Sequence, residues 1–203
     1  MIRLGILAST KGTDMQAIID AIESKKLDAE IKVVISDKED AYALKRAKKH
    51  NLNAVFLDPK GREKEEYDKE LDKILEENKV ELVLLIGYMK LISPWFVNKW
   101  LNKVMNIHPS LLPAYAGGID LNVHEEVLKR GCKITGCSLI FIDEGADTGP
   151  IILQKIVDIE DNETPETLKE KVQKEEQKIL IEGIKLFAEG KLKVKEKRVE
   201  IKK

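Results

Sequence analysis

The chain has 203 residues, a length typical of one globular domain with a substantial core. Its 35 lysines and arginines nearly balance its 36 aspartates and glutamates, and the two signs alternate along the sequence, so nucleic-acid binding is disfavoured. No apolar stretch approaches about 18 residues and the N-terminus lacks a signal-peptide pattern, so we expect a cytoplasmic protein with no membrane partner. The cysteines, Cys132 and Cys137, should stay reduced, and the spacing of the histidines indicates no metal site.

In the first half of the sequence, short apolar runs alternate with amphipathic stretches. The pattern predicts strands over residues 2–7, 29–36, 54–57, 82–86 and 104–108, and helices over 15–24, 41–50, 65–77 and 93–98. The run 82–86 is almost wholly apolar, as in a strand that is covered on both faces. These features predict an α/β fold with a doubly wound, mostly parallel sheet.

The second half has a different organisation. A short helix is predicted over 123–130, and strands over 135–142 and 151–158 suggest an antiparallel extension at one end of the sheet. Thr164 and Pro165 should begin a long C-terminal helix that reaches Ala188, with Gly190 at its end. Residues 191–203 alternate charged and apolar side chains, which suits either an edge strand or a frayed tail. We expect a single domain over 1–203, with halves 1–108 and 109–203 and no linker.

A polar pair ends the predicted strand at 104–108. Asn106 and His108 are two residues apart, so in a strand both side chains project from the same face. Pro109 cannot continue the hydrogen-bond ladder, which places His108 at the carboxyl end of the strand, where open parallel sheets bind ligands. An amide beside an imidazole can stabilise an oxyanion and move a proton, as acyl transfer requires. The alternative is a polar strand end with a solvated histidine.

The first connection from strand to helix, residues 8–16, has the composition of a phosphate-binding turn. Thr13 and Gln16 have the spacing of a capping box, so a helix should begin near Thr13 with its N–H groups and positive dipole end facing an anion. Gly12 would allow close approach of the backbone. The segment matches neither of the glycine-rich patterns typical of ATP or NAD binding, so no nucleotide cofactor is expected. An ordinary helix cap is the structural alternative.

Residues 143–150 gather three carboxylates and two glycines between the last two predicted strands. The spacing does not fit a calcium loop, and a solvated acidic loop is the common explanation of such a run. If a carboxylate folded back toward His108, it would favour the imidazolium form, a better partner for an oxyanion.

As a set, these segments resemble the phosphoribosylglycinamide formyltransferase family. The resemblance covers nearly the whole chain and is carried by KGTDMQAII at 11–19, GYMKLISP at 87–94, NIHPSLLP at 106–113 and DTGPIILQ at 147–154. It implies a Rossmann-like formyltransferase fold and transfer of a formyl group from 10-formyltetrahydrofolate, as co-substrate, to the amino group of glycinamide ribonucleotide. It implies no metal and small-molecule partners, and it leaves a homodimer open.

The resemblance also assigns roles to individual residues. The catalytic group would be Asn106, His108 and Asp147. The ribonucleotide would be bound by Gly12, Thr13, Asp14 and Glu176. The folate would be bound by Lys64, Met89, Lys90, Leu91, Ile92 and Asn106. Met89, Leu91 and Ile92 would equally suit an ordinary apolar core.

The chain departs from the family pattern at four places. Asp14 stands where the family commonly has Asn, and Lys64 where it has a folate-contacting Arg, for which Arg62 is an alternative. Ile140 stands where the family often has a His. The segment 117–124 is longer than the usual Gly-x-His-x-His, with His124 as the second of those histidines.

Three other functions remain as alternatives. Formyltetrahydrofolate deformylases use a similar Asn/His/Asp set to pass the formyl group to water, but they carry an extra N-terminal domain, whereas strand 2–7 begins at once here. Methionyl-tRNA formyltransferases share the Asn-x-His core but add a C-terminal domain and a basic surface. A non-catalytic mononucleotide-binding module would bind its ligand without turnover.

Overall fold

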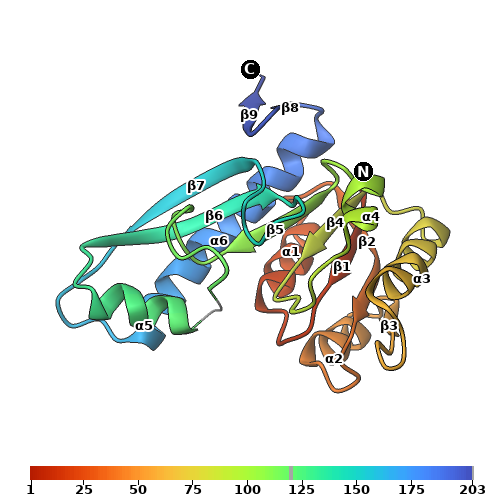
Figure 1. Cartoon of the computed structure of the whole chain (residues 1–203), viewed down its shortest axis with the longest axis horizontal. Coiled ribbons are helices and arrows are strands. Elements are labelled where there is room, and N and C mark those ends of the chain that lie inside the picture. Colours follow the sequence, from red (N-terminus) through yellow and green to blue (C-terminus); the bar gives the residue numbers. More distant parts are fainter. Residues whose placement is uncertain (119–120, 203) are drawn as a thin grey trace. The chain divides into compact units, whose positions relative to one another are not determined.

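The computed structural model describes residues 1–118 and 121–202, which form two compact units, Met1–Asn106 and Ile107–Lys203. The first unit is built on parallel strands in the order β3-β2-β1-β4-β5 (Figure 1). These strands are β1 (Ile2–Leu7), β2 (Ala29–Ser36), β3 (Ala54–Phe56), β4 (Leu82–Leu85) and β5 (Val104–His108), of which β5 ends in the second unit.

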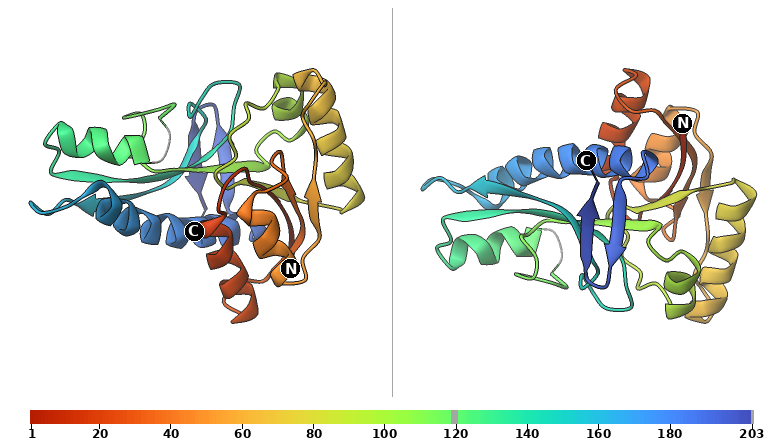
Figure 2. Two further views of the ribbon diagram at one scale, coloured as in Figure 1. Left: turned by 90° about the horizontal axis from the view of Figure 1, so that it is seen from below. Right: turned by 90° about the horizontal axis from the view of Figure 1, so that it is seen from above.

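Helices cover both faces of this parallel sheet, as the doubly wound pattern predicts. They are α1 (Thr13–Glu23), α2 (Tyr42–Lys49), α3 (Lys64–Glu77) and α4 (Pro94–Lys99). Figure 2 shows α1 and α2, in red and orange, on one face, and α3 and α4, in yellow and yellow-green, on the other. Every residue of β4 is buried, because this strand is covered on both sides.

The parallel register places polar residues at the carboxyl end of the sheet. Asn106 of β5 lies opposite Leu85, the last residue of β4. Since ligands of open α/β sheets bind at this edge, the register puts Asn106 where the sequence analysis expects a site.

The second unit is built around an antiparallel pair of long strands. Its elements are α5 (Leu121–Lys129), β6 (Ile134–Phe141), β7 (Ile151–Asp158), α6 (Pro165–Ala188), β8 (Leu192–Lys195) and β9 (Arg198–Ile201). β6 and β7 pair from Ile134–Asp158 to Ile140–Ile151, and the strands follow the order β6-β7-β9-β8. The helix α6 runs along β6 and β7 (Figures 1 and 2).

The long helix α6 begins and ends where its sequence signals predict. The Thr164 hydroxyl accepts the N–H of Thr167 at 3.3 Å, and the Thr167 hydroxyl accepts the N–H of Thr164 at 2.9 Å, which makes a capping box ahead of Pro165. Gly190, at φ 64°, follows the last turn in the left-handed conformation that ends helices. A buried stripe fixes the helix against its unit: Leu168, Val172, Ile179, Leu180 and Ile184.

The C-terminal segment is a β-hairpin and not a frayed tail. β8 and β9 pair antiparallel from Leu192–Ile201 to Lys195–Arg198, and Ile151 of β7 pairs with Arg198 of β9. The predicted fold class is therefore confirmed in its doubly wound parallel sheet, its antiparallel pair and its long C-terminal helix.

Close packing at Gly136 of β6 gives a test of this architecture. A Cβ atom there would lie 1.9 Å from the carbonyl oxygen of Lys155 and 2.8 Å from a methyl carbon of Leu111. Because backbone would have to move, we expect Gly136→Ala to lower the free energy of unfolding by about 3 kcal/mol. Gly61→Ala is the matched control, since nothing lies within 4 Å of its Cβ position and only its φ of +75° opposes the change. It should cost about 1 kcal/mol. Urea denaturation of both variants measures the difference, and equal losses would contradict the packing of β6 on β7.

Candidate active site

The turn between β1 and α1 leaves the start of the helix open to an anion. α1 begins at Thr13, and its N-cap, Gly12, has φ 62° and offers no side-chain cap. A Cβ atom at Gly12 would lie 3.0 Å from the Cβ of Ala43, so both the backbone angle and the close approach favour glycine. Backbone N–H groups and the positive end of the helix dipole therefore come together at Gly12, Thr13 and Asp14.

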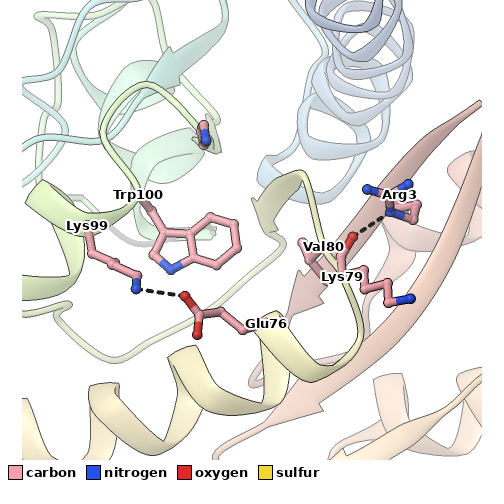
Figure 3. A pocket seen from close by; sticks show the side chains of 7 residues that line it. Arg3, Glu76, Lys79, Val80, Lys99 and Trp100 are labelled. Atoms are coloured by element: carbon pink, nitrogen blue, oxygen red, sulfur yellow. Dashed lines mark hydrogen bonds and ion pairs between the residues drawn. The ribbon is translucent and has the colours of Figure 1, made fainter.

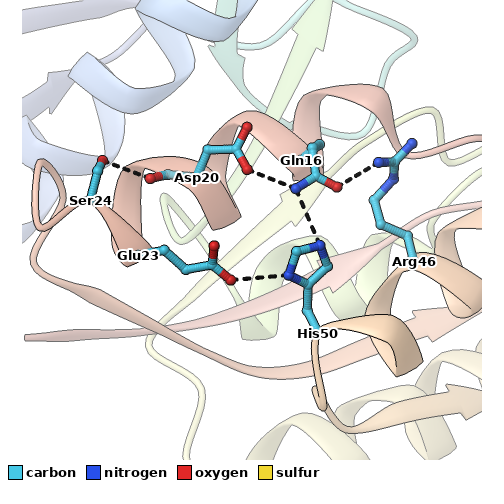
Figure 4. Close-up of polar contacts among 6 residues, drawn as sticks. All are labelled: Gln16, Asp20, Glu23, Ser24, Arg46 and His50. Atoms are coloured by element: carbon cyan, nitrogen blue, oxygen red, sulfur yellow. Dashed lines mark hydrogen bonds and ion pairs between the residues drawn. The ribbon is translucent and has the colours of Figure 1, made fainter.

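The prediction of a capping box formed by Thr13 and Gln16 is wrong. Because Gly12 is the N-cap, Thr13 is already the first helical residue, and the Gln16 side chain turns to α2 instead. Its oxygen accepts a hydrogen bond from Arg46 Nη1 at 2.5 Å, and its nitrogen donates to Asp20 at 2.7 Å (Figure 4). The same nitrogen lies 3.3 Å from His50 Nε2.

The same network connects the turn between β1 and α1 to α2. Arg46 Nε donates to the carbonyl of Lys11 at 3.5 Å, while His50 Nδ1 lies 3.0 Å from a Glu23 carboxylate oxygen (Figure 4). Side chains of α2 and of its C-cap residue thus contact the turn at Lys11 and helix α1 at Gln16 and Glu23, which favours a fixed arrangement of the N–H groups between them.

The segment expected to bind folate leaves β4 at the same edge of the sheet. Gly87 has φ 58°, and the N–H of Met89 donates to Ser9 Oγ at 2.9 Å. Met89 and Leu91 are 47% and 73% exposed. The alternative in which these two residues are ordinary core is therefore wrong, and apolar side chains are presented to solvent beside the end of β1.

His108 ends β5 and is buried, with a side chain only 4% exposed. Its Nδ1 lies 3.3 Å from Asp147 Oδ2, and its Nε2 lies 3.1 Å from the carbonyl of Tyr115. Both ring nitrogens therefore face oxygen atoms that can accept a hydrogen bond. The structure thus brings a carboxylate of the acidic loop to the histidine.

Asp147 is held from two sides. Its Oδ2 also accepts the N–H of Gly117 at 2.9 Å, and its backbone has φ 55°, a conformation that is uncommon for a residue other than glycine. The three carboxylates of the loop have different surroundings, because Asp143 bonds within the loop and Glu144 is exposed. Asp147 is the carboxylate that contacts His108.

The remaining predicted site residues lie in varied surroundings. Glu176 is buried on α6, whereas Lys64 is exposed as the first residue of α3. Arg62, the alternative to Lys64, pairs with Glu70 at 3.1 Å and donates to the carbonyl of Asp58.

Two further predicted folate contacts follow β4. Lys90 Nζ lies 4.7 Å from the ring centre of Tyr67, and burial raises the pKa of Tyr67 to about 12. Ile92 is half-buried.

Two departures from the family pattern lie in the second unit, at Ile140 and in the segment 117–124. Ile140 is buried in β6 and pairs with Ile151, and His124 is buried in α5. Ile119 and Asp120, in the segment expected to be longer than usual, lie outside the described residues.

Three contributors to the site could not be predicted from residue types. Two are backbone groups, the Tyr115 carbonyl and the Gly117 N–H, and every residue has such groups whatever its type. The third is the Lys197 side chain, which contacts the acidic loop from the C-terminal hairpin. Only the alternation of charged and apolar residues in the hairpin could have suggested an ordered segment there.

A hollow of about 290 Å³ lies elsewhere in the first unit, at the amino ends of β1 and β4. Figure 3 shows Lys99 paired with Glu76 beside the ring of Trp100, and Arg3 bonded to the carbonyl of Lys79. Its position at the edge opposite the strand carboxyl ends sets it apart from the expected ligand site.

Metal clusters and membrane spans are both missing from the described part of the chain. Among residues 1–118 and 121–202, no group of three or more His, Cys, Asp or Glu residues is placed to hold a metal ion. No helix in the same part of the chain is long and apolar enough to cross a membrane.

Comparison with known proteins identifies the family of the chain. Residues 2–184 match the formyl transferase family. The phosphoribosylglycinamide formyltransferase of Haemophilus influenzae is 38% identical over 197 residues, which cover 97% of this chain and 92% of that one. The human trifunctional purine biosynthetic protein adenosine-3 is 37% identical over 189 residues, but the chain spans only 18% of its length.

Solved structures give the same relationship. Glycinamide ribonucleotide transformylase 1 of Symbiobacterium toebii superposes with a TM-score of 0.94 at 40% identity, over 100% of this chain and 95% of that one. A formyltetrahydrofolate deformylase of Pseudomonas syringae superposes with a TM-score of 0.89 over 100% of this chain and 66% of that one, but at 22% identity it shares the fold alone. The chain therefore belongs to the formyl transferase family and, within it, to the phosphoribosylglycinamide formyltransferases.

Proposed function

We propose that the protein transfers the formyl group of 10-formyltetrahydrofolate to the amino group of glycinamide ribonucleotide. The products would be formylglycinamide ribonucleotide and tetrahydrofolate, in de novo purine (IMP) biosynthesis in the cytoplasm. The observation that carries the proposal is the buried contact of 3.3 Å between His108 Nδ1 and Asp147 Oδ2 at the end of β5. Family membership supports the substrates.

The reaction needs stabilisation of negative charge and transfer of a proton. The amine nitrogen of glycinamide ribonucleotide attacks the formyl carbon, the carbonyl becomes an oxyanion, and the bond to the folate nitrogen then breaks. The attacking nitrogen loses a proton and the folate nitrogen gains one. A donor aimed at the oxyanion and a group that moves protons are therefore the required parts.

The residues of β5 supply these parts. Asn106 and His108 are two residues apart in one strand, so their side chains project from the same face. Asp147 holds Nδ1 and fixes the orientation of the imidazole ring. The Nε2 proton, which here bonds the Tyr115 carbonyl, would exchange that acceptor for the formyl oxygen.

The substrates would be bound by the surfaces described above. The N–H groups of Gly12, Thr13 and Asp14 would bind the ribonucleotide phosphate, and the Glu176 carboxylate would bind its glycinamide amine. The exposed apolar side chains of Met89 and Leu91 would contact the folate ring, with Lys90, Ile92, Asn106 and Lys64 as further folate contacts. No group besides the folate is needed for this chemistry.

One assay separates this function from its alternatives. The protein is incubated with a 10-formyl folate analogue, and absorbance is followed with and without glycinamide ribonucleotide. A transferase changes the absorbance only with both compounds present. A deformylase changes it with the folate alone, and a binding module changes it in neither mixture.

His108→Ala tests the central residue. Removing the imidazole takes away both the oxyanion donor and the proton carrier, so kcat should fall by about 10² to 10⁴-fold. Dissociation constants of both substrates, measured by calorimetry, should change little. Near-wild-type turnover in a folded variant would exclude the assigned role.

Asp147→Asn keeps the shape of the side chain and removes its charge. The amide oxygen that replaces the carboxylate could still accept the N–H of Gly117, so the loop should fold, but His108 would lose its charged partner. We expect kcat to fall by at least about 10- to 100-fold, the loss found when partners that orient metal-binding histidines are removed. Glu144→Gln is the matched control, because it removes the same charge from an exposed position of the same loop. Equal effects of the two variants on steady-state kcat would contradict the role of Asp147.

Asp14→Asn tests the phosphate site. If the phosphate is bound by backbone N–H groups, the Asp14 carboxylate contributes only repulsion, and its removal should leave the affinity for glycinamide ribonucleotide unchanged or tighter. Calorimetric titration with the ribonucleotide measures this affinity. A large loss would mean that the carboxylate itself binds the substrate.

A further inference from the structure

The loop that carries Asp147 is fixed at its base but not at its tip by the β6–β7 pair. At the base, the N–H of Phe141 donates to the carbonyl of Pro150 at 2.9 Å. Gly149 packs there so closely that a Cβ atom would lie 1.8 Å from the carbonyl oxygen of Phe141. Between these points, residues 143–148 leave the ladder, and Asp147 has a left-handed backbone. Something other than strand pairing has to hold this part of the loop.

The Asp143 side chain is the centre of the loop. Its Oδ1 accepts the N–H of Gly145 at 3.1 Å and the hydroxyl of Thr148 at 2.7 Å. One carboxylate oxygen therefore joins residues on both sides of Asp147. Because the Asp143 side chain is partly buried, a nearby cation would help to stabilise its charge.

That cation comes from the C-terminal hairpin. Lys197 lies in the two-residue turn between β8 and β9, and its Nζ contacts Asp143 Oδ2 and donates to the carbonyl of Thr148 at 2.9 Å. Arg198, the next residue, pairs with Ile151, the first residue of β7. The hairpin is thus anchored beside the loop that its turn contacts.

We propose that Lys197 is a positioning residue for formyl transfer, because it clamps the loop that presents Asp147 to His108. It acts on both ends of the segment around Asp147, through the Asp143 carboxylate and the Thr148 carbonyl. The substrates need not touch it. This role rests on the proposed function of the His108–Asp147 pair.

The charge state of Asp143 agrees with such a clamp. Burial alone would raise its pKa, but hydrogen bonds from Lys197, Thr148 and the Gly145 N–H outweigh that effect and hold the pKa below its usual value. The carboxylate is therefore ionised, and paired with Lys197, throughout the neutral pH range.

Lys197→Met tests the clamp, with Lys195→Met as the matched control. Lys195 lies on the same hairpin and pairs with Glu200 on β9 at 2.7 Å. Both variants remove one lysine charge, but only the first should loosen the loop. We expect Lys197→Met to lower kcat by about 3- to 10-fold, the size of one charge-assisted contact that is partly exposed, with KM for both substrates unchanged. Lys195→Met should match the wild type, and Lys197→Arg should recover most of kcat.

A second readout does not depend on turnover. The N–H of Gly117 donates to Asp147 Oδ2, so its hydrogen exchange reports whether that carboxylate is in place. The exchange rate should rise in Lys197→Met and not in Lys195→Met. If the wild type lacks formyl transfer but the exchange result holds, the proposed function fails while the clamp stands.

Two results would contradict the proposed role of Lys197. It is overturned if Lys197→Met behaves as Lys195→Met in both kcat and Gly117 exchange, or if it raises KM with kcat unchanged. Asp143→Asn removes the other partner and should lower kcat similarly, and the double variant Asp143→Asn with Lys197→Met should be little worse than either single one. Fully multiplicative effects would mean that the two residues act independently.

Discussion

The candidate active site is organised around one contact, between the buried imidazole of His108 and the carboxylate of Asp147. A buried imidazole needs acceptors for its N–H groups, and a partly buried carboxylate needs donors. His108 and Asp147 are therefore partners for each other, and each has one further backbone partner, the Tyr115 carbonyl for His108 and the Gly117 N–H for Asp147. The left-handed backbone of Asp147, which costs on the order of 1 kcal/mol, is stable because these contacts fix the residue there.

Much of the fold could be predicted from the sequence because its signals are local. Thr164 and Pro165 mark the start of α6, and Val104 and Met105 ahead of Asn106 mark the start of β5. The position of His108 at a strand end follows from Pro109, which cannot join a ladder. Such signals act over a few residues, so they are readable without the rest of the chain.

The parts that could not be predicted depend on distant contacts. Gln16 has the spacing of a capping residue, yet it bonds to Arg46 because Gly12 has taken the N-cap position and α2 lies within reach. Met89 and Leu91 are apolar, and an apolar residue type alone does not say whether it is core or surface. The link from Lys197 to Asp143 joins residues 54 positions apart, and neither residue type indicates the other.

The lysines of β8 have a consequence beyond the active site. β8 is the last strand in the order of its unit, and its residues Lys193 and Lys195 are exposed while Leu192 and Val194 are half-buried. A terminal strand offers its backbone to any other extended chain, and regularly spaced positive charges are a common way to repel that pairing. In a concentrated solution, the same hairpin that bears Lys197 would thus discourage strand addition and edge-to-edge aggregation.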